Sequence, residues 1–126
     1  MKKMNNKGFT LMEVLIVVAI IAVLVAIAIP VMNSQLEKSR EAVDAANIRS
    51  AYAEVSVAYL TGDFGEGNVN LTKEVTLKQK SDGWQNAELQ DPNLFPVAQT
   101  NSPKAGKTCT VAANEATGVI TIKFNQ

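Results

Sequence analysis

One uninterrupted apolar run constrains this 126-residue chain more than any other feature. Every residue from Val14 to Ile29 is Val, Leu, Ile or Ala, and the surrounding segment 9–32 contains a single charge, Glu13. At about 1.5 Å of rise per helical residue, this segment spans roughly 36 Å, which exceeds a hydrocarbon core of about 30 Å. Because a backbone in lipid must satisfy its own hydrogen bonds, the sequence predicts a membrane-spanning helix over residues 9–32.

Charge and composition give the expected orientation and exclude several classes of protein. Lys2, Lys3 and Lys7 precede the apolar run and no acidic residue does, which predicts a cytoplasmic N-terminus and a translocated remainder. Twelve basic residues balance twelve acidic ones, so there is no strong case for nucleic-acid binding. With no His and one Cys, the chain lacks the usual zinc ligands and an internal disulfide.

Two simpler interpretations of the N-terminus compete with the one developed below. One is a cleaved secretory signal peptide, in which residues 26–28 (Ala-Ile-Ala) would be the small-residue cleavage site. The other is a plain uncleaved anchor. Both leave Glu13 unexplained, since a carboxylate inside a membrane helix costs about 2.5–3.5 kcal/mol on insertion scales. The apolar run is also longer than the roughly 7–15 residues of an ordinary signal-peptide core.

The residues just before the apolar run carry a specific motif. Residues 7–13 read KGFTLME and resemble the cleavage and methylation motif of type IV prepilins. The resemblance is close over about the first fifty residues and only architectural beyond them. It implies that a membrane-embedded prepilin peptidase cuts between Gly8 and Phe9 and N-methylates Phe9. It also assigns Thr10, Leu11 and Glu13 to processing and assembly.

Charge chemistry accounts for the carboxylate of Glu13. Cleavage after Gly8 creates an α-amine on Phe9, and a free α-amine has a pKa of about 7.7–8.0 and is largely protonated near neutrality. Glu13 then has a cationic partner, either Phe9 of its own chain, four residues back, or Phe9 of a neighbouring subunit. A misregistered neighbour would leave the carboxylate unpaired in hydrocarbon, which penalises wrong registers. The open alternative is that Glu13 reaches the cytoplasmic headgroups.

Pro30 is expected to kink the helix without ending it. Membrane helices tolerate proline because neighbouring groups satisfy the freed carbonyl, and residues 33–60 continue with a helical pattern free of Gly and Pro. The proline also matches the family to which the motif points. We therefore expect one helix from residue 9 to about residue 60, with Gly62 as its C-terminal stop.

The second half of this helix has an apolar stripe that predicts a packing face. Its members recur at spacings of three and four residues: Ile48, Tyr52, Val55 and Tyr59, widened by Ala45 and Ala51. The preceding turns are polar, and Arg40 and Asp44 are spaced to pair at i,i+4.

The remaining residues, 63–126, predict a small sheet. Residues 62–68 form a glycine-rich turn. Residues 69–79 alternate as a strand with Val69, Leu71, Val75 and Leu77 inward, apart from Lys73 on that inner face. Residues 108–112 and 119–124 form a hairpin across residues 114–118, and Cys109 is a small buried hydrophobe. The expected fold class is α+β, a long N-terminal helix packed against a small antiparallel sheet, as in the type IV pilin fold.

The resulting hypothesis is a structural subunit with four segments: a leader (1–8), a transmembrane and assembly half of the helix (9–32), an amphipathic half (33–62) and a globular head (63–126). No nucleophile–base pair, cofactor loop or metal set is found, so no catalysis and no cofactor are expected. One Cys means that the C-terminal disulfide loop of many pilins is absent, which resembles Gram-positive members.

The resemblance also implies partners and a location. Copies would polymerise through their N-terminal helices, with a prepilin peptidase, an assembly ATPase and a membrane platform as partners. The subunit would start as a single-pass protein of the cytoplasmic membrane and end in an extracellular pilus serving adhesion, aggregation or twitching motility on host or abiotic surfaces.

Two alternatives of different class stay open. One is a pseudopilin of a type II secretion or competence DNA-uptake system, although loss of the three leader lysines leaves an excess of three acidic side chains, which disfavours a direct grip on DNA. The other is a soluble binding domain that starts at Ile29 after signal-peptidase cleavage.

Overall fold

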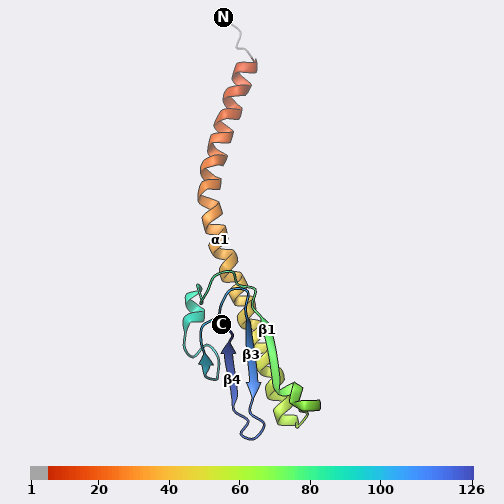
Figure 1. Ribbon diagram of the computed structural model, residues 1–126. Helices are drawn as coiled ribbons and strands as arrows, with labels where there is room; N and C mark the ends of the chain where they lie inside the picture. The colour runs from red at the N-terminus through yellow and green to blue at the C-terminus, as the bar shows by residue number, and fades with distance from the viewer. Residues whose placement is uncertain (1–5) are drawn as a thin grey trace, which may run out of the picture. The chain divides into compact units, whose positions relative to one another are not determined.

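The computed structural model describes the backbone from Asn6 to the C-terminus and the side chains from Thr10 onward (Figure 1). A long helix is followed by four short strands and two short 3-10 helices. The elements are α1 (Asn6–Thr61), η1 (Glu66–Leu71), β1 (Thr72–Thr76), η2 (Ala87–Gln90), β2 (Gln99–Thr100), β3 (Thr108–Ala113) and β4 (Ile120–Phe124). The chain divides into two compact units at Gln35–Leu36, and α1 contributes to both.

The first unit is helical throughout its described part. The helix passes through Pro30 without interruption, so the predicted continuation beyond the proline is confirmed. Pro30 lacks an N–H, which leaves the carbonyl one turn earlier without its helical donor. A kink at Pro30 stays a prediction.

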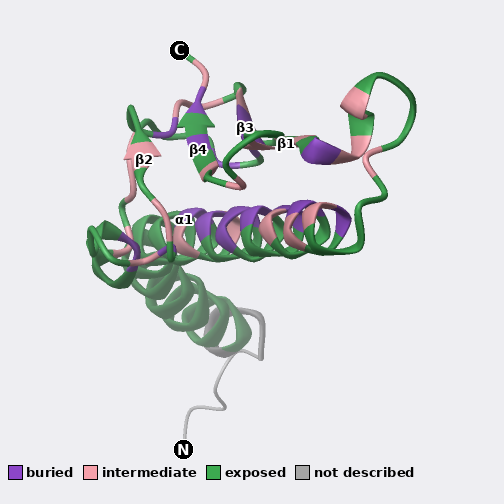
Figure 2. Ribbon diagram, turned by 90° about the horizontal axis from the view of Figure 1, so that it is seen from below, coloured by how far each residue is buried: buried purple, intermediate pink, exposed green. Residues whose placement is uncertain are grey.

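The second half of α1 forms one wall of the core in the second unit, Leu36–Gln126. Ala45, Ile48, Ala51 and Val55 are buried, which confirms the stripe predicted from their spacing. Figure 2 shows the buried residues on the side of α1 that faces the strands and exposed residues on the opposite side. The helix ends at Thr61, where Gly62 has a φ of 72° and donates its N–H to the carbonyl of Tyr59 at 3.3 Å. Glycine adopts this left-handed conformation readily.

The sheet has the order β1-β3-β4-β2. The pairs β1–β3 and β3–β4 are antiparallel, and the predicted hairpin of residues 108–112 and 119–124 is confirmed as β3 and β4. Gly118 in its turn has a φ of 73°, and a Cβ there would lie 2.6 Å from the ring of Tyr59, so the turn sits directly on α1. The sheet departs from a purely antiparallel one because β2, which the sequence did not predict, pairs parallel to β4.

The core lies between α1 and the inner face of the sheet. Cys109 and Val111 of β3 and Ile122 and Phe124 of β4 are fully buried against the helix stripe. Trp84 packs edge-on against Phe124, with ring centroids 5.9 Å apart. Such an aromatic pair contributes about 0.5–1.5 kcal/mol beyond its burial. Because Cys109 is fully buried in this core, it is a small buried hydrophobe, as predicted.

The predicted strand over residues 69–79 is too long at both ends. Gly67 and Asn68 have positive φ angles of 67° and 62°, and they fold the chain into η1, which leaves Val69 61% exposed instead of inward. At the other end the strand stops at Thr76, because the N–H groups of Lys78 and Gln79 donate to the Asp44 carboxylate and not to a neighbouring strand.

Three buried carboxylates of α1 fix the segment that follows β1, and we call them the acidic ladder: Glu37, Glu41 and Asp44. Asp44 accepts the N–H groups of residues 78 and 79 at 2.8–3.0 Å, Glu37 those of residues 80 and 81 at 2.8–3.1 Å, and Glu41 those of residues 85 and 86. The predicted Arg40–Asp44 pair is wrong. Arg40 lies 3.5 Å from Glu37, and both oxygens of Asp44 are occupied by backbone donors.

Candidate assembly site

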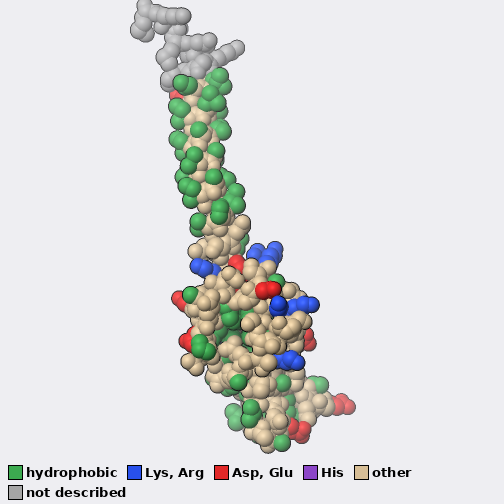
Figure 3. All heavy atoms as spheres, turned by 60° about the vertical axis from the view of Figure 1, so that its left-hand side comes forward, with side chains coloured by type: hydrophobic (Ala, Val, Ile, Leu, Met, Phe, Trp, Pro, Cys, Tyr) green, Lys and Arg blue, Asp and Glu red, His purple; other side chains and the backbone are tan. Residues whose placement is uncertain are grey.

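The first half of α1 presents an apolar surface on every side. From Leu11 to Met32 its large apolar side chains are 44% to 63% exposed, and no residue of the most apolar window is buried. Figure 3 shows hydrophobic side chains along the whole visible face of this segment. A helix that is apolar all round requires lipid or other apolar partners, and this one is long and apolar enough to cross a membrane.

Glu13 is the only charged side chain between Thr10 and Leu36. It is exposed on α1, and within the described residues it forms no hydrogen bond or ion pair. Glu13 lies four residues after Phe9 in the sequence of α1. Its surroundings among the described residues are apolar, and the carboxylate has no neutralising group there.

The other predicted processing residues lie at the edge of the described chain. Gly8 and Phe9 have helical backbone in α1, but the Phe9 side chain and the whole of residues 1–5 of the leader lie outside the described residues. Thr10 and Leu11 are described and exposed, Leu11 at 61%. These motif residues lie consecutively in α1. Cleavage between Gly8 and Phe9 stays a prediction.

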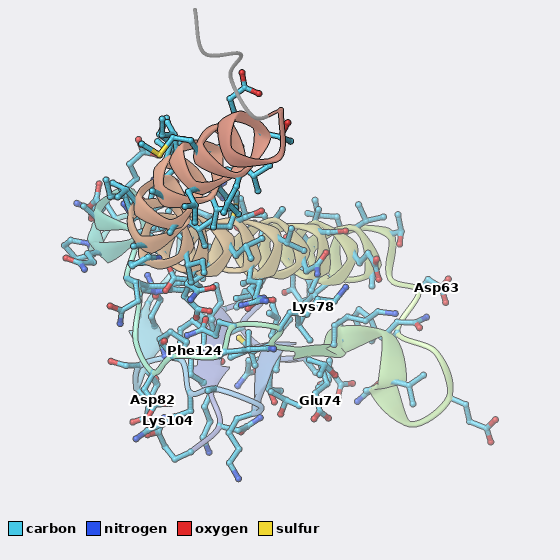
Figure 4. The ribbon with its side chains drawn as sticks, turned by 90° about the horizontal axis from the view of Figure 1, so that it is seen from above. Asp63, Glu74, Lys78, Asp82, Lys104 and Phe124 are labelled. Atoms are coloured by element: carbon cyan, nitrogen blue, oxygen red, sulfur yellow. The ribbon has the colours of Figure 1, made fainter. Side chains whose placement is uncertain are left out.

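The head presents two perturbed titratable groups, and neither forms a reactive centre. Burial raises the pKa of the Cys109 thiol to about 12, so it stays protonated and unreactive at neutral pH. The pKa of Asp82 is lowered, mainly because its carboxylate accepts the N–H of Ala105 at 2.9 Å, and Lys104 lies 3.6 Å away (Figure 4). Through these two contacts, Asp82 links its own loop to the loop of residues 104–105. Within residues 10–126 no cluster of acidic or Cys side chains is arranged to hold a metal ion.

The acidic ladder is the structural feature that sequence reasoning missed. Its residues 37, 41 and 44 are spaced by four and three, and Ile48 follows after four more, so the ladder continues the buried stripe toward the N-terminus. Acidic residues in line with an apolar stripe are a signal for buried carboxylates that accept hydrogen bonds from another segment.

Comparisons with known proteins agree with this arrangement. Residues 3–29 match the prokaryotic N-terminal methylation motif, which defines the class: a protein whose apolar N-terminal helix follows a methylation signal. The type IV major alpha-pilin of Moraxella bovis is 31% identical over 137 aligned positions, covering 95% of this chain and 86% of that protein. The type IV narrow pilus major component PilA5 of Thermus thermophilus is 49% identical over 57 positions, covering 43% of this chain and 49% of that protein.

No solved structure matches the chain significantly. The near full-length similarity nevertheless shows that the chain belongs to the type IV pilin family. The absence of a C-terminal disulfide loop agrees with a single, unbonded Cys109. The family is one of structural subunits and not of enzymes.

Proposed function

We propose that this chain is a subunit of a type IV pilus filament. The observation that carries the proposal is the helical surface of residues 10–32, which is apolar on all sides and interrupted by Glu13 alone. Such a surface is stable in lipid before assembly and against the same helices of other copies afterwards. Relatives named as major pilins support this function.

Maturation would give Glu13 its partner. We propose that a prepilin peptidase recognises residues 7–13, Thr10 and Leu11 included, removes residues 1–8 by cutting between Gly8 and Phe9, and methylates the Phe9 amine. The leader carries Lys2, Lys3 and Lys7, so the new amine becomes the one cation of the apolar segment. Phe9 then also begins the helix, and a carboxylate in the first turns is favoured by the free N–H groups there.

The pairing of Glu13 with a Phe9 amine would set the axial register of the copies. In a low-dielectric core, attraction between the two charges is large but desolvation offsets much of it. Leaving either charge unpaired in the core still costs free energy. A neighbouring copy shifted by one helical turn is therefore disfavoured. The pair therefore selects one register and adds little to overall affinity.

The same surface implies a membrane stage. Residues 9–32 would span the cytoplasmic membrane once, with residues 33–62 and the head 63–126 on the outer side. An assembly ATPase and a membrane platform would then extract the subunit into an extracellular filament. Adhesion, aggregation and twitching motility are the outputs to test first.

Imaging of cells tests the proposal against the pseudopilin alternative. A strain lacking this chain, complemented with the wild-type sequence, is examined by electron microscopy together with the material sheared from its surface. We expect long extracellular fibres that contain the chain and disappear in the deletion strain. Short periplasmic stubs, or a chain that stays dispersed after export, would contradict the filament function.

A further inference from the structure

The segment that the acidic ladder holds on α1, residues 78–86, contains the one Asp-Gly step of the chain. We call this segment the strap. At an Asp-Gly step the side-chain carboxyl can react with the backbone nitrogen of the glycine, which has no Cβ beside it. The nitrogen bonds to Cγ, one molecule of water leaves, and a succinimide ring results. Water then opens the ring, and attack at the backbone carbonyl leaves the chain running through the aspartate side chain, as isoaspartate.

The exposure and the backbone of the strap make this step available for the reaction. The Asp82 side chain is 61% exposed, so water reaches it freely. Gly83 has a φ of 74°, a conformation that favours glycine. A Cβ at Gly83 would meet nothing within 4 Å, which leaves the backbone angle as the reason for the glycine. The reactive pair is therefore a consequence of the turn that the strap makes.

Hydrogen bonds hold the attacking nitrogen away from the reaction. The N–H of Gly83 donates to the carbonyl of Pro103 at 2.8 Å, and Pro103 is fully buried. Ring formation requires this nitrogen to lose its proton and to turn toward Asp82, so the hydrogen bond must first break. The carbonyl of Gly83 is held as well, because Nε2 of Gln79 donates to it at 2.9 Å. The peptide group on each side of Gly83 is therefore fixed.

The carboxylate of Asp82 is held by the same loop. One oxygen accepts the N–H of Ala105 at 2.9 Å, and the other lies 3.6 Å from the ammonium group of Lys104 (Figure 4). These contacts favour the ionised carboxylate and lower its pKa, the hydrogen bond from Ala105 most. The ionised carboxylate is the unreactive form, because water leaves only from the protonated acid. Both reacting groups are therefore engaged by residues 103–105.

The acidic ladder restrains the strap on both sides of the step. Glu37 accepts the N–H groups of the two residues before Asp82, and Glu41 accepts those of residues 85 and 86. Both carboxylates are buried on α1. The strap therefore separates from residues 103–105 only by bending between these two anchors or by releasing one of them.

We propose that Asp82–Gly83 is a covalent modification site gated by the strap: it forms isoaspartate when the strap leaves residues 103–105 and stays aspartate while the two are joined. A reaction that proceeds only from an opened state is governed by the free energy of local opening. Isoaspartate adds a methylene group to the backbone path and displaces the Gly83 N–H from its acceptor, so the modified strap does not close as before. For a subunit exported as proposed above, a closed strap preserves the head outside the cell. The inference itself stands without the pilus function.

Ageing of the full-length chain tests the gate. The detergent-solubilised protein is kept at neutral pH, either folded or in denaturant. The peptide containing residues 82 and 83 is then analysed by electron-transfer mass spectrometry, which distinguishes isoaspartate from aspartate. We expect isoaspartate to form at least about tenfold more slowly in the folded protein, because only the opened fraction reacts. Equal rates would overturn the gate, and a denatured chain that forms no isoaspartate would overturn the site.

Substitutions separate the parts of the gate. Glu37→Ala frees the N–H groups before Asp82 and should speed isoaspartate formation in the folded chain several-fold. Glu74→Ala, at an exposed position of β1, is the matched control and should age as the wild type does. Asp82→Glu supplies the background signal, because its longer side chain closes a larger ring and reacts far more slowly.

Lys104→Ala removes only the ion pair with Asp82 and should give a smaller rise in rate. It also supplies the test if circular dichroism shows that Glu37→Ala does not fold. Wild-type rates of isoaspartate formation in every folded variant of Glu37 and Lys104 would overturn the gate.

Discussion

The carboxylates of the acidic ladder and that of Glu13 both lie on α1, and their surroundings predict different roles. Those of the acidic ladder are buried and saturated by backbone N–H donors. Glu13 is exposed in an apolar segment and has no donor among the described residues. A carboxylate of the second kind is retained at a cost in hydrocarbon, which supports the proposal that its partner is the Phe9 amine created by processing.

Replacing Glu13 tests that interpretation. For Glu13→Ala we expect cleavage after Gly8 to proceed, while Phe9 methylation and filament formation fall strongly, because the amine of each copy loses its counter-charge. Glu13→Gln keeps the size and removes the charge, so it should show the same defect. The measurement is filament yield by shearing and immunoblotting. Wild-type yield from either variant would remove the proposed role of the charge.

Cys109 gives a prediction for pH dependence. Its pKa is about 12 in the folded head against 9.0 for an ordinary thiol. Above pH 9 the unfolded state therefore loses the thiol proton while the folded state keeps it, so stability is full below pH 9 and declines between pH 9 and about 12. Cys109→Ala should be destabilised by the cavity at neutral pH but lose less stability between these pH values.

The same thiol should resist labelling at pH 8 until a denaturant is added. Iodoacetamide incorporation, followed by intact mass, is the measurement. Rapid labelling of the native protein would show that Cys109 is not enclosed as described.

At the scale of elements, the sequence pattern predicted the features that depend on residues close together in the chain. The stripe containing Ile48 and Val55, the stop at Gly62 and the hairpin of β3 and β4 all follow from local spacing and turn chemistry. The methylation motif likewise identified the segment around Glu13. The start of β1, the parallel partner β2 and the acidic ladder depend on contacts distant in sequence. Asp44, for example, accepts the N–H of a residue 34 positions away; its place in the stripe signals burial, but no local pattern specifies which segment donates to it.

We expect the three carboxylates of the acidic ladder to hold residues 78–86 on α1. Glu41→Ala removes the buried carboxylate that accepts the N–H groups of Gln85 and Asn86, and a hydrogen bond to a charged group contributes about 1.5–3 kcal/mol. Thermal unfolding of the detergent-solubilised chain should show a clearly lowered midpoint. Glu74→Ala, at an exposed position of β1, serves as the control and should change stability by at most about 0.5 kcal/mol. Equal losses in both variants would argue against the ladder.

At the scale of the whole molecule, a long apolar surface is left uncovered in the described chain. The segment 10–32 of α1 requires lipid or other apolar helices. The second unit has its own core, and the sheet and the acidic ladder hold its segments together through hydrogen bonds. A chain with its own core and an uncovered apolar helix segment suits a subunit that joins other copies, which is the physical basis of the proposed filament.

The most direct test of the account is the intact mass of the subunit taken from sheared filaments, with sequencing of its N-terminal peptide. The account predicts a chain that begins at Phe9 and carries one methyl group on its α-amine, with Glu13 unmodified. A subunit that retains Met1, or one that begins at Ile29, would contradict it.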